Sequence, residues 1–344
     1  MKTKLICLLL PLVLLGCSKK SPPPSAISLP EITVVEPAES VEQNQIQKQA
    51  LDLFKAKEYD QLEALAAKYR ASKEGYADGT WKLVSVYTGL DLTDDDAEPV
   101  WQEREKEIRD WIQAKPESVT AQVELGRFLA DYAWKARGSG YAGSVKDEGW
   151  QLFGQRLQSA AQVLAGAGQL DERCPVYWSA LQKVALGLQL DRKRYDNIFN
   201  KAIEEFPDYQ YYYRSRAVYL LPRWNGGDGE LERDLEQSAD HIGGEAGDMV
   251  YAQVVWDVHG YGSSTNVFKE NNLSWARTDR GFEAILNKYP DSLKAKNEAA
   301  HLAALAGDPV AALKYFQLTK GQVDVSLWDD KDQFVNCYKW ALGQ

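Results

Sequence analysis

Apolar side chains recur at intervals of three and four residues from Val41 onward, and almost no stretch alternates between apolar and polar positions. Intervals of three and four residues are typical of amphipathic helices, whereas apolar/polar alternation is typical of strands. The pattern predicts a first hairpin from helices at residues 46–54 and 62–69, with a turn at 57–59. Further helices are predicted at 81–87, 103–114, 119–136, 150–165, 175–190 and 195–206. The expected fold class is all-α.

Two prolines and a glycine-rich corner interrupt this pattern between residues 204 and 230. Pro207 is expected to end one helix because proline cannot continue it, and Asp208 to cap the next with its side-chain oxygen. Pro222 is expected to end that second helix. The run 225–229 is rich in residues that tolerate positive φ, and Glu230 is expected to begin another helix.

Several positions fall in the 34-residue frame of helical repeats, and together they resemble degenerate tetratricopeptide repeats. Gly307-Asp308-Pro309 forms the turn of the last unit, since glycine ends a helix and Asp-Pro begins one. Ile285 stands where the pattern has alanine, and the spacing is irregular. The resemblance implies irregular hairpins stacked as a superhelical array, clearest at about 275–344. The positions that carry it are Leu125-Gly126, Phe199, Ala202, Pro207, Phe282, Pro290, Ala300, Ala312 and Phe316.

The N-terminal residues have the pattern of a bacterial lipoprotein leader. Lys2 and Lys4 precede an apolar run at 5–15, which is too short to span a bilayer as a stable helix. Leu14-Leu15-Gly16-Cys17 resembles a lipobox, in which cleavage leaves Cys17 as the lipidated N-terminus. We therefore expect a signal peptide at 1–16 and acyl chains, such as palmitate, that hold the protein on a membrane.

A Pro- and Ser-rich segment follows the lipobox, and residues 17–40 are interpreted as a linker to a helical-repeat domain at 41–344. The residue after Cys17 is Ser18 rather than aspartate. In the lipoproteins that this leader resembles, that choice favours the outer membrane. The expected location is the cell envelope, on the periplasmic face of the outer membrane if the organism has two membranes.

Charge and motif content narrow the candidate chemistry. Lys plus Arg is 40 and Asp plus Glu is 50, a net charge of -10, which argues against a nucleic-acid partner. The three histidines are far apart and lack ligand spacing, and no nucleophile elbow or phosphate loop occurs, so no metal, cofactor or catalytic residue is predicted. Beyond the leader and Cys17, Cys174 and Cys337 remain, and the sequence leaves their pairing open.

Three phrases resemble those of a bacterial family of unknown function with a helical-repeat body. They are DGTWKLVSVYTGL at 78–90, DYAWKARGSGYAGSVKDEGWQLF at 131–153 and YLLPRWNGGDGELE at 219–232. The resemblance spans about residues 46–252. It implies a fold and carries no activity, so it transfers no functional residue.

Aromatic residues and arginines gather at two predicted loops, which is the composition of protein interfaces. Alternatively, these arginines cap helix ends and stack on neighbouring rings, holding the hairpin junctions together. The candidates for partner contact are Tyr132, Trp134, Arg137, Tyr141, Tyr212, Arg216, Arg223 and Trp224.

The sequence therefore favours a membrane-anchored envelope protein that binds a protein or peptide through a helical-repeat surface, and favours binding over catalysis. The alternative is an α/α-toroid carbohydrate-active enzyme or carbohydrate-binding protein. The chain has 11 Trp and many carboxylates. Such toroids have a cleft lined by tryptophans and use a pair of carboxylates for catalysis. No particular carboxylate pair stands out in the sequence.

Overall fold

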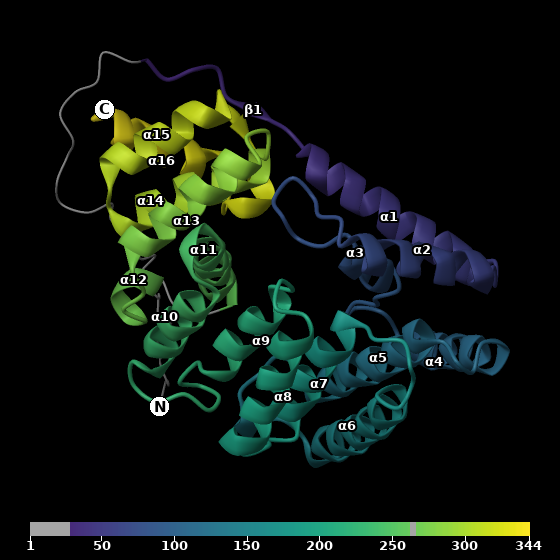
Figure 1. The fold of residues 1–344 in the computed structure, drawn as a ribbon. Helices are drawn as coiled ribbons and strands as arrows, with labels where there is room; N and C mark the ends of the chain where they lie inside the picture. Colours follow the sequence, from purple (N-terminus) through teal and green to yellow (C-terminus); the bar gives the residue numbers. More distant parts are fainter. Residues whose placement is uncertain (1–27, 262–265) are drawn as a thin grey trace, which may run out of the picture. The chain divides into compact units, whose positions relative to one another are not determined.

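The computed structural model describes residues 28–261 and 266–344. Within them are 16 α-helices and one pair of two-residue strands, which confirms the all-α fold class (Figure 1). The chain divides into two compact units: residues 36–295, and residues 296–344 with the segment up to Val35. The predicted signal peptide at 1–16, Cys17 and the first part of the linker lie outside the described residues. No described helix has the length and apolar character needed to cross a membrane.

The larger unit consists of consecutive helices that pack mainly on their neighbours in the chain. It contains α1 (Ala38–Lys55), α2 (Tyr59–Ser72), α3 (Leu83–Thr88), α4 (Glu98–Ala114), α5 (Val119–Arg137), a 3-10 turn η1 (Ala142–Ser144), α6 (Asp147–Ala167), α7 (Pro175–Gly187), α8 (Arg192–Glu205), α9 (Tyr211–Tyr219), α10 (Glu230–Ile242), α11 (Gly244–Tyr261), α12 (Val267–Glu270) and α13 (Trp275–Lys288). α14 (Leu293–Ala306) begins in this unit and continues into the smaller one.

Buried aromatic residues hold neighbouring hairpins together in the larger unit. Trp111 on α4 stacks on Tyr59 with ring centroids 5.9 Å apart and meets Phe54 edge-on at 6.0 Å. Trp101 on α4 stacks on Tyr132 of α5 at 5.0 Å. Both tryptophans are almost fully buried, so they contribute apolar area between helices.

The first and last segments of the larger unit are bonded to each other. Glu39, in the first turn of α1, accepts hydrogen bonds from Ser292 Oγ at 2.8 Å and from the Lys294 backbone N–H at 3.0 Å. Lys294 Nζ also lies 2.7 Å from the Asp78 carboxylate. Glu39 is only 5% exposed, and a carboxylate removed from water needs such donors.

The smaller unit combines most of α14 and two further helices with a short parallel sheet. Its other elements are β1 (Thr33–Val34), α15 (Pro309–Thr319), β2 (Gln322–Val323), the 3-10 turn η2 (Val325–Leu327) and α16 (Lys331–Leu342). Thr33 pairs with Gln322 and Val34 with Val323. Gly307 has a positive φ and the Asp308 side chain accepts from the Val310 and Ala311 amides, as the predicted turn requires.

Two local predictions differ from the structure, and one question that the sequence left open is answered for Cys174. The first helix begins at Ala38 and Thr33–Val34 forms a strand, so ordered structure starts within the segment interpreted as a linker. Asp208 does not cap α9, because that helix begins at Tyr211 and its N-cap is Gln210; the Asp208 carboxylate pairs with Lys73 Nζ at 2.9 Å. The disulfide left open for Cys174 does not form, and its thiol lies 3.1 Å from the Tyr87 hydroxyl.

Candidate functional site

The connection between α5 and α6, residues 138–146, carries an exposed tyrosine and is called here the α5–α6 loop. Gly138 ends α5 with φ of 72°, a conformation that favours glycine. None of the three η1 residues that follow is buried. Tyr141 is 91% exposed, the largest exposed fraction among the described large hydrophobic side chains. The loop therefore holds an aromatic ring in solvent.

Arg137 attaches this loop to the body of the unit. Its NH1 donates to the carbonyl oxygens of Gly138 at 2.9 Å and Gly140 at 3.0 Å. The guanidinium carbon lies 5.6 Å from the ring centre of Trp134 and 5.7 Å from those of Trp150 and Trp224. An arginine among aromatic faces is stabilised by attraction to their π-electrons, so these contacts restrain the loop.

The arginine–tryptophan cluster joins two stretches that are far apart in sequence. Trp134 and Trp224 meet edge to face, with ring centroids 5.5 Å apart. Trp224 follows Pro222 and Arg223 in the connection between α9 and α10, whereas Trp134 and Arg137 lie in the last turn of α5. The structure thus brings together three of the residues selected from sequence.

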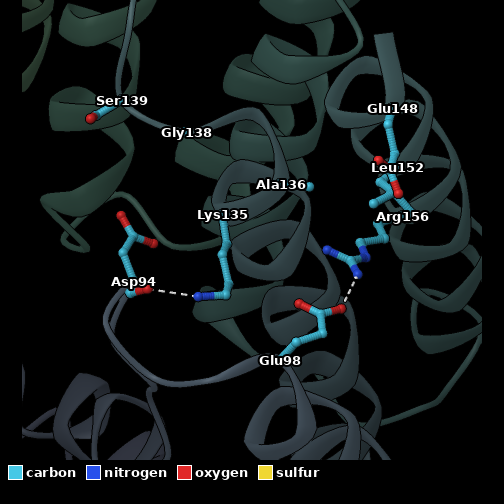
Figure 2. Close-up of a pocket in the computed structure, with 9 residues that line it drawn as sticks. All are labelled: Asp94, Glu98, Lys135, Ala136, Gly138, Ser139, Glu148, Leu152 and Arg156. Atoms are coloured by element: carbon cyan, nitrogen blue, oxygen red, sulfur yellow. Dashed lines mark hydrogen bonds and ion pairs between the residues drawn. The ribbon is translucent and has the colours of Figure 1, made fainter. Parts of the chain in front are cut away.

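A cavity of about 540 Å³ lies beside the α5–α6 loop (Figure 2). Its volume falls within the range of small-ligand sites. The lining comes from the segment that leads into α4, from the end of α5 with the start of the loop, and from the first turns of α6. The lining residues are Asp94, Glu98, Lys135, Ala136, Gly138, Ser139, Glu148, Leu152 and Arg156.

Glu98, Tyr132 and Arg156 form a connected polar group at the cavity wall. Arg156 NH2 donates to Glu98 Oε1 at 2.8 Å, and its guanidinium stacks 3.3 Å from the Tyr132 ring centre. The Tyr132 hydroxyl donates to the same carboxylate oxygen. Burial, together with this bond to Glu98, raises the pKa of Tyr132 to about 12, so the phenol stays protonated at neutral pH. These three side chains therefore bond one another and form one polar side of the cavity.

The other candidates from the sequence lie elsewhere in the larger unit. Tyr212 is fully buried, and its hydroxyl donates to the Pro175 carbonyl oxygen at 2.9 Å. Arg216 bonds the Asp234 carboxylate with NH2 at 2.6 Å and Nε at 2.8 Å, and bonds Asp196 with NH1 at 2.7 Å. Arg223 is exposed and donates to the Tyr261 carbonyl oxygen.

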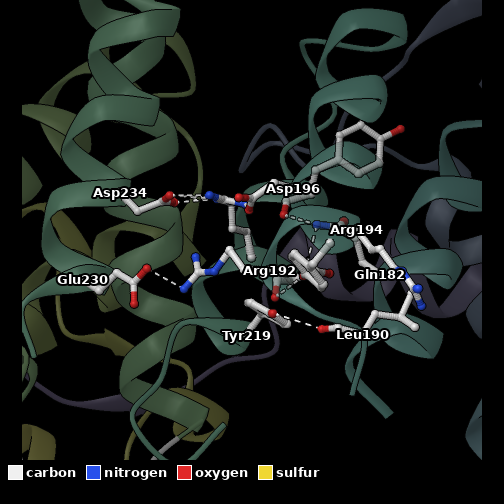
Figure 3. Close-up of polar contacts among 12 residues, drawn as sticks. Gln182, Leu190, Arg192, Arg194, Asp196, Tyr219, Glu230 and Asp234 are labelled. Carbon is white, nitrogen blue, oxygen red and sulfur yellow. Dashed lines mark hydrogen bonds and ion pairs between the residues drawn. The ribbon is translucent and has the colours of Figure 1, made fainter. Parts of the chain in front are cut away.

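Figure 3 labels Asp196 and Asp234, the two carboxylates that Arg216 bonds, together with the neighbouring pair of Arg192 and Glu230. These bonds link α8, α9 and α10. Tyr132, Tyr212 and Arg216 are thus engaged inside the protein, whereas Tyr141 projects into solvent.

Sequence reasoning did not select Asp94 as a binding residue, nor Glu98, Glu148 or Arg156. Asp94 belongs to a run of three aspartates, residues 94–96, whose composition is typical of a solvated loop. Arg156 lies on a predicted helix, and Glu98 and Glu148 lie a few residues before predicted helices. All three stand among many similar charges, and no local motif sets them apart. In the part of the chain that the structure describes, no group of His, Cys, Asp and Glu side chains is arranged to hold a metal ion.

The fold and this site define an all-α helical-repeat protein with a charged cavity beside an exposed tyrosine. Residues 47–182 match the model of a protein family described as a domain of unknown function (DUF4034). The match contains the cavity, the α5–α6 loop and the phrases at 78–90 and 131–153, whereas the phrase at 219–232 lies beyond it. A comparison with curated proteins finds no match.

Proposed function

We propose that this protein is a lipid-anchored envelope protein that binds a protein or peptide through the α5–α6 loop and the cavity beside it. The observation that carries the binding proposal is Tyr141, 91% exposed on a loop that Arg137 restrains. A loop whose backbone is already held in position loses less conformational entropy when it meets a partner. Tyrosine is also among the residues that dominate binding energy at interfaces.

The anchoring proposal is supported by the leader and by Cys17 in its lipobox-like setting. Metabolic labelling with an alkyne-bearing palmitate in the native host tests it. The wild type is expected to incorporate the label, and Cys17→Ser to lose it completely, because the acyl-bearing atoms depend on the Cys17 sulfur and amino group. Cys7→Ser, a change inside the leader, is the matched control and should keep the label. Equal labelling of Cys17→Ser and wild type would contradict lipidation at Cys17.

The binding proposal is tested by cross-linking the full-length protein in its native envelope and identifying what is captured. We expect one enriched protein or peptide. Tyr141→Ala should weaken binding to it at least about tenfold, as loss of an interface aromatic does, with an unchanged melting temperature because the ring is exposed. Tyr261→Ala, at an exposed tyrosine on α11, is the control and should bind like the wild type.

Two results would contradict the binding proposal. One is equal capture by Tyr141→Ala and wild type. The other is recovery of glycan without a protein partner, which would favour the carbohydrate alternative. None of the nine residues that line the cavity is a tryptophan, although that alternative calls for a tryptophan-lined cleft.

A further inference from the structure

The two cations that line the cavity are already held by the protein. Lys135 Nζ donates to the backbone carbonyl oxygens of Asp94 at 2.6 Å and Asp96 at 2.8 Å, and lies 5.4 Å from the Trp101 ring centre. Arg156 bonds Glu98 and donates to the Tyr132 carbonyl oxygen at 2.9 Å. Both side chains therefore serve as parts of the cavity wall.

Two carboxylates of the lining, unlike these cations, make no hydrogen bond or ion pair with other described residues. Among the described residues, no hydrogen bond or ion pair reaches the carboxylate of Asp94 or that of Glu148. Asp94 comes from the segment before α4 and Glu148 from the first turn of α6, and Figure 2 shows them on different sides of the cavity. Three carboxylates and two cations leave the lining with one formal negative charge.

The apolar part of the lining complements these charges. Ala136 and Leu152 present aliphatic atoms, and Leu152 lies one helical turn from both Glu148 and Arg156 on α6. Long basic side chains combine an aliphatic stem with a charged end that has several donors and no acceptor. An anionic group, in contrast, would face the two unpaired carboxylates and be repelled.

We propose that this cavity receives a basic side chain, lysine or arginine, of the peptide or protein partner. This inference rests on the proposed binding function and names the chemistry recognised at its site. The stem packs along Ala136 and Leu152 while the charged end lies between Asp94 and Glu148. Gly138 and Ser139 belong to both the cavity wall and the α5–α6 loop, so Tyr141 contacts the partner next to the inserted side chain.

The test uses the full-length protein in detergent micelles and a ligand-observed NMR titration. The first probe is lysine capped at both main-chain ends, and its matched control is the same compound acetylated on the side-chain amine. We expect the capped lysine to bind and the acetylated form to bind at least tenfold more weakly, because acetylation removes the charge. The double variant Asp94→Asn/Glu148→Gln should bind capped lysine at least tenfold more weakly than the wild type.

Asp147→Asn is the control variant, since Asp147 is exposed on the same turn of α6 and does not line the cavity. It should bind within twofold of the wild type. Glu148→Gln alone provides a second, milder variant, with circular dichroism checking that each variant is folded. Equal binding of the two probes, or equal binding by the double variant and the wild type, would overturn the inference.

A third probe, 1,5-diaminopentane, distinguishes a free amine from a peptide side chain as the source of the ammonium group. Tighter binding of capped lysine supports a peptide source, whereas tighter binding of the diamine overturns the assignment to a partner side chain. The native-envelope capture keeps the two proposals separate. A partner captured equally by the double variant and the wild type, with no binding of capped lysine, leaves the binding function intact and rejects only the basic side chain.

Discussion

Arg216→Leu is expected to lower the free energy of unfolding by about 3 kcal/mol, at the lower end of what breaking a buried ion pair costs. The Arg216 side chain is 11% exposed and holds two carboxylates, which are 35% exposed for Asp196 and 20% for Asp234. Leucine would leave these carboxylates without their shared cation. Because they retain some contact with water, the loss stays near the lower end of the range. Burial by itself lowers the pKa of Arg216, but the attraction of the two carboxylates is larger in sum and raises that pKa. The guanidinium is therefore charged at every pH of interest.

Urea denaturation followed by circular dichroism measures this loss. Arg223→Leu is the matched control, since Arg223 is exposed and makes one hydrogen bond, to the Tyr261 carbonyl oxygen, and it should cost less than about 1 kcal/mol. Adding Asp234→Asn to Arg216→Leu should recover part of the stability, because one uncompensated charge is removed. A loss of less than about 1 kcal/mol for Arg216→Leu would show that the network does not stabilise the junction of α8, α9 and α10.

The second large effect concerns Glu124 on α5, which is 1% exposed. Burial raises its pKa from 4.5 to about 7. Arg127 lies 3.0 Å away and favours the carboxylate, but it also pairs with Asp91 and Asp131, and removal from water outweighs its attraction. Between pH 4.5 and about pH 7, the Glu124 carboxyl therefore keeps its proton in the folded state and has released it in the unfolded state.

The sign of the pH dependence follows from this difference in bound protons. Stability contributed by protonated Glu124 is present below pH 4.5 and is lost as the pH rises to about 7. Between pH 5 and pH 8 the wild type should lose on the order of 2 to 3 kcal/mol through this group, at about 1.4 kcal/mol per pKa unit. Glu124→Gln, which cannot ionise and still offers Arg127 an acceptor, should not lose that part.

Urea denaturation at several pH values between 5 and 8 tests the Glu124 prediction. The quantity to compare is the stability of Glu124→Gln relative to the wild type, which should rise with pH. Glu117→Gln, a change at an exposed glutamate, should show no such trend. Parallel stability curves for Glu124→Gln and the wild type would mean that Glu124 is ionised in the folded protein throughout this range.

Local signals in the sequence were sufficient for most helices and several of their ends. The turn at Gly307-Asp308-Pro309 formed as predicted because a positive φ, a capping carboxylate and a proline all act within a few residues. Asp208 shows the limit of such reasoning. The next helix begins two residues later than a cap at Asp208 requires, and the carboxylate pairs with Lys73, which is distant in sequence.

In the candidate site, too, the sequence was enough to select some residues, but it did not reveal which residues meet. Local composition was enough to select Trp134, Arg137 and Trp224, because aromatic residues and arginines are enriched at protein interfaces. Their meeting around one guanidinium depends on how α5 and the corner after α9 are brought together by packing. The cavity was not predicted, since Glu98 and Arg156 lie 58 positions apart and carry no shared pattern.

The sequence by itself determined the all-α class, the main helices and the exposed aromatic loop, because helical periodicity, caps and glycine turns are properties of neighbouring residues. Only the tertiary structure decided which charges are paired and which face a cavity. Asp94 and Glu148 are indistinguishable in sequence from the many solvated carboxylates of this chain. Their environment is set by the packing of α4, α5 and α6, and the strength of an electrostatic interaction depends on distance and burial rather than on residue type.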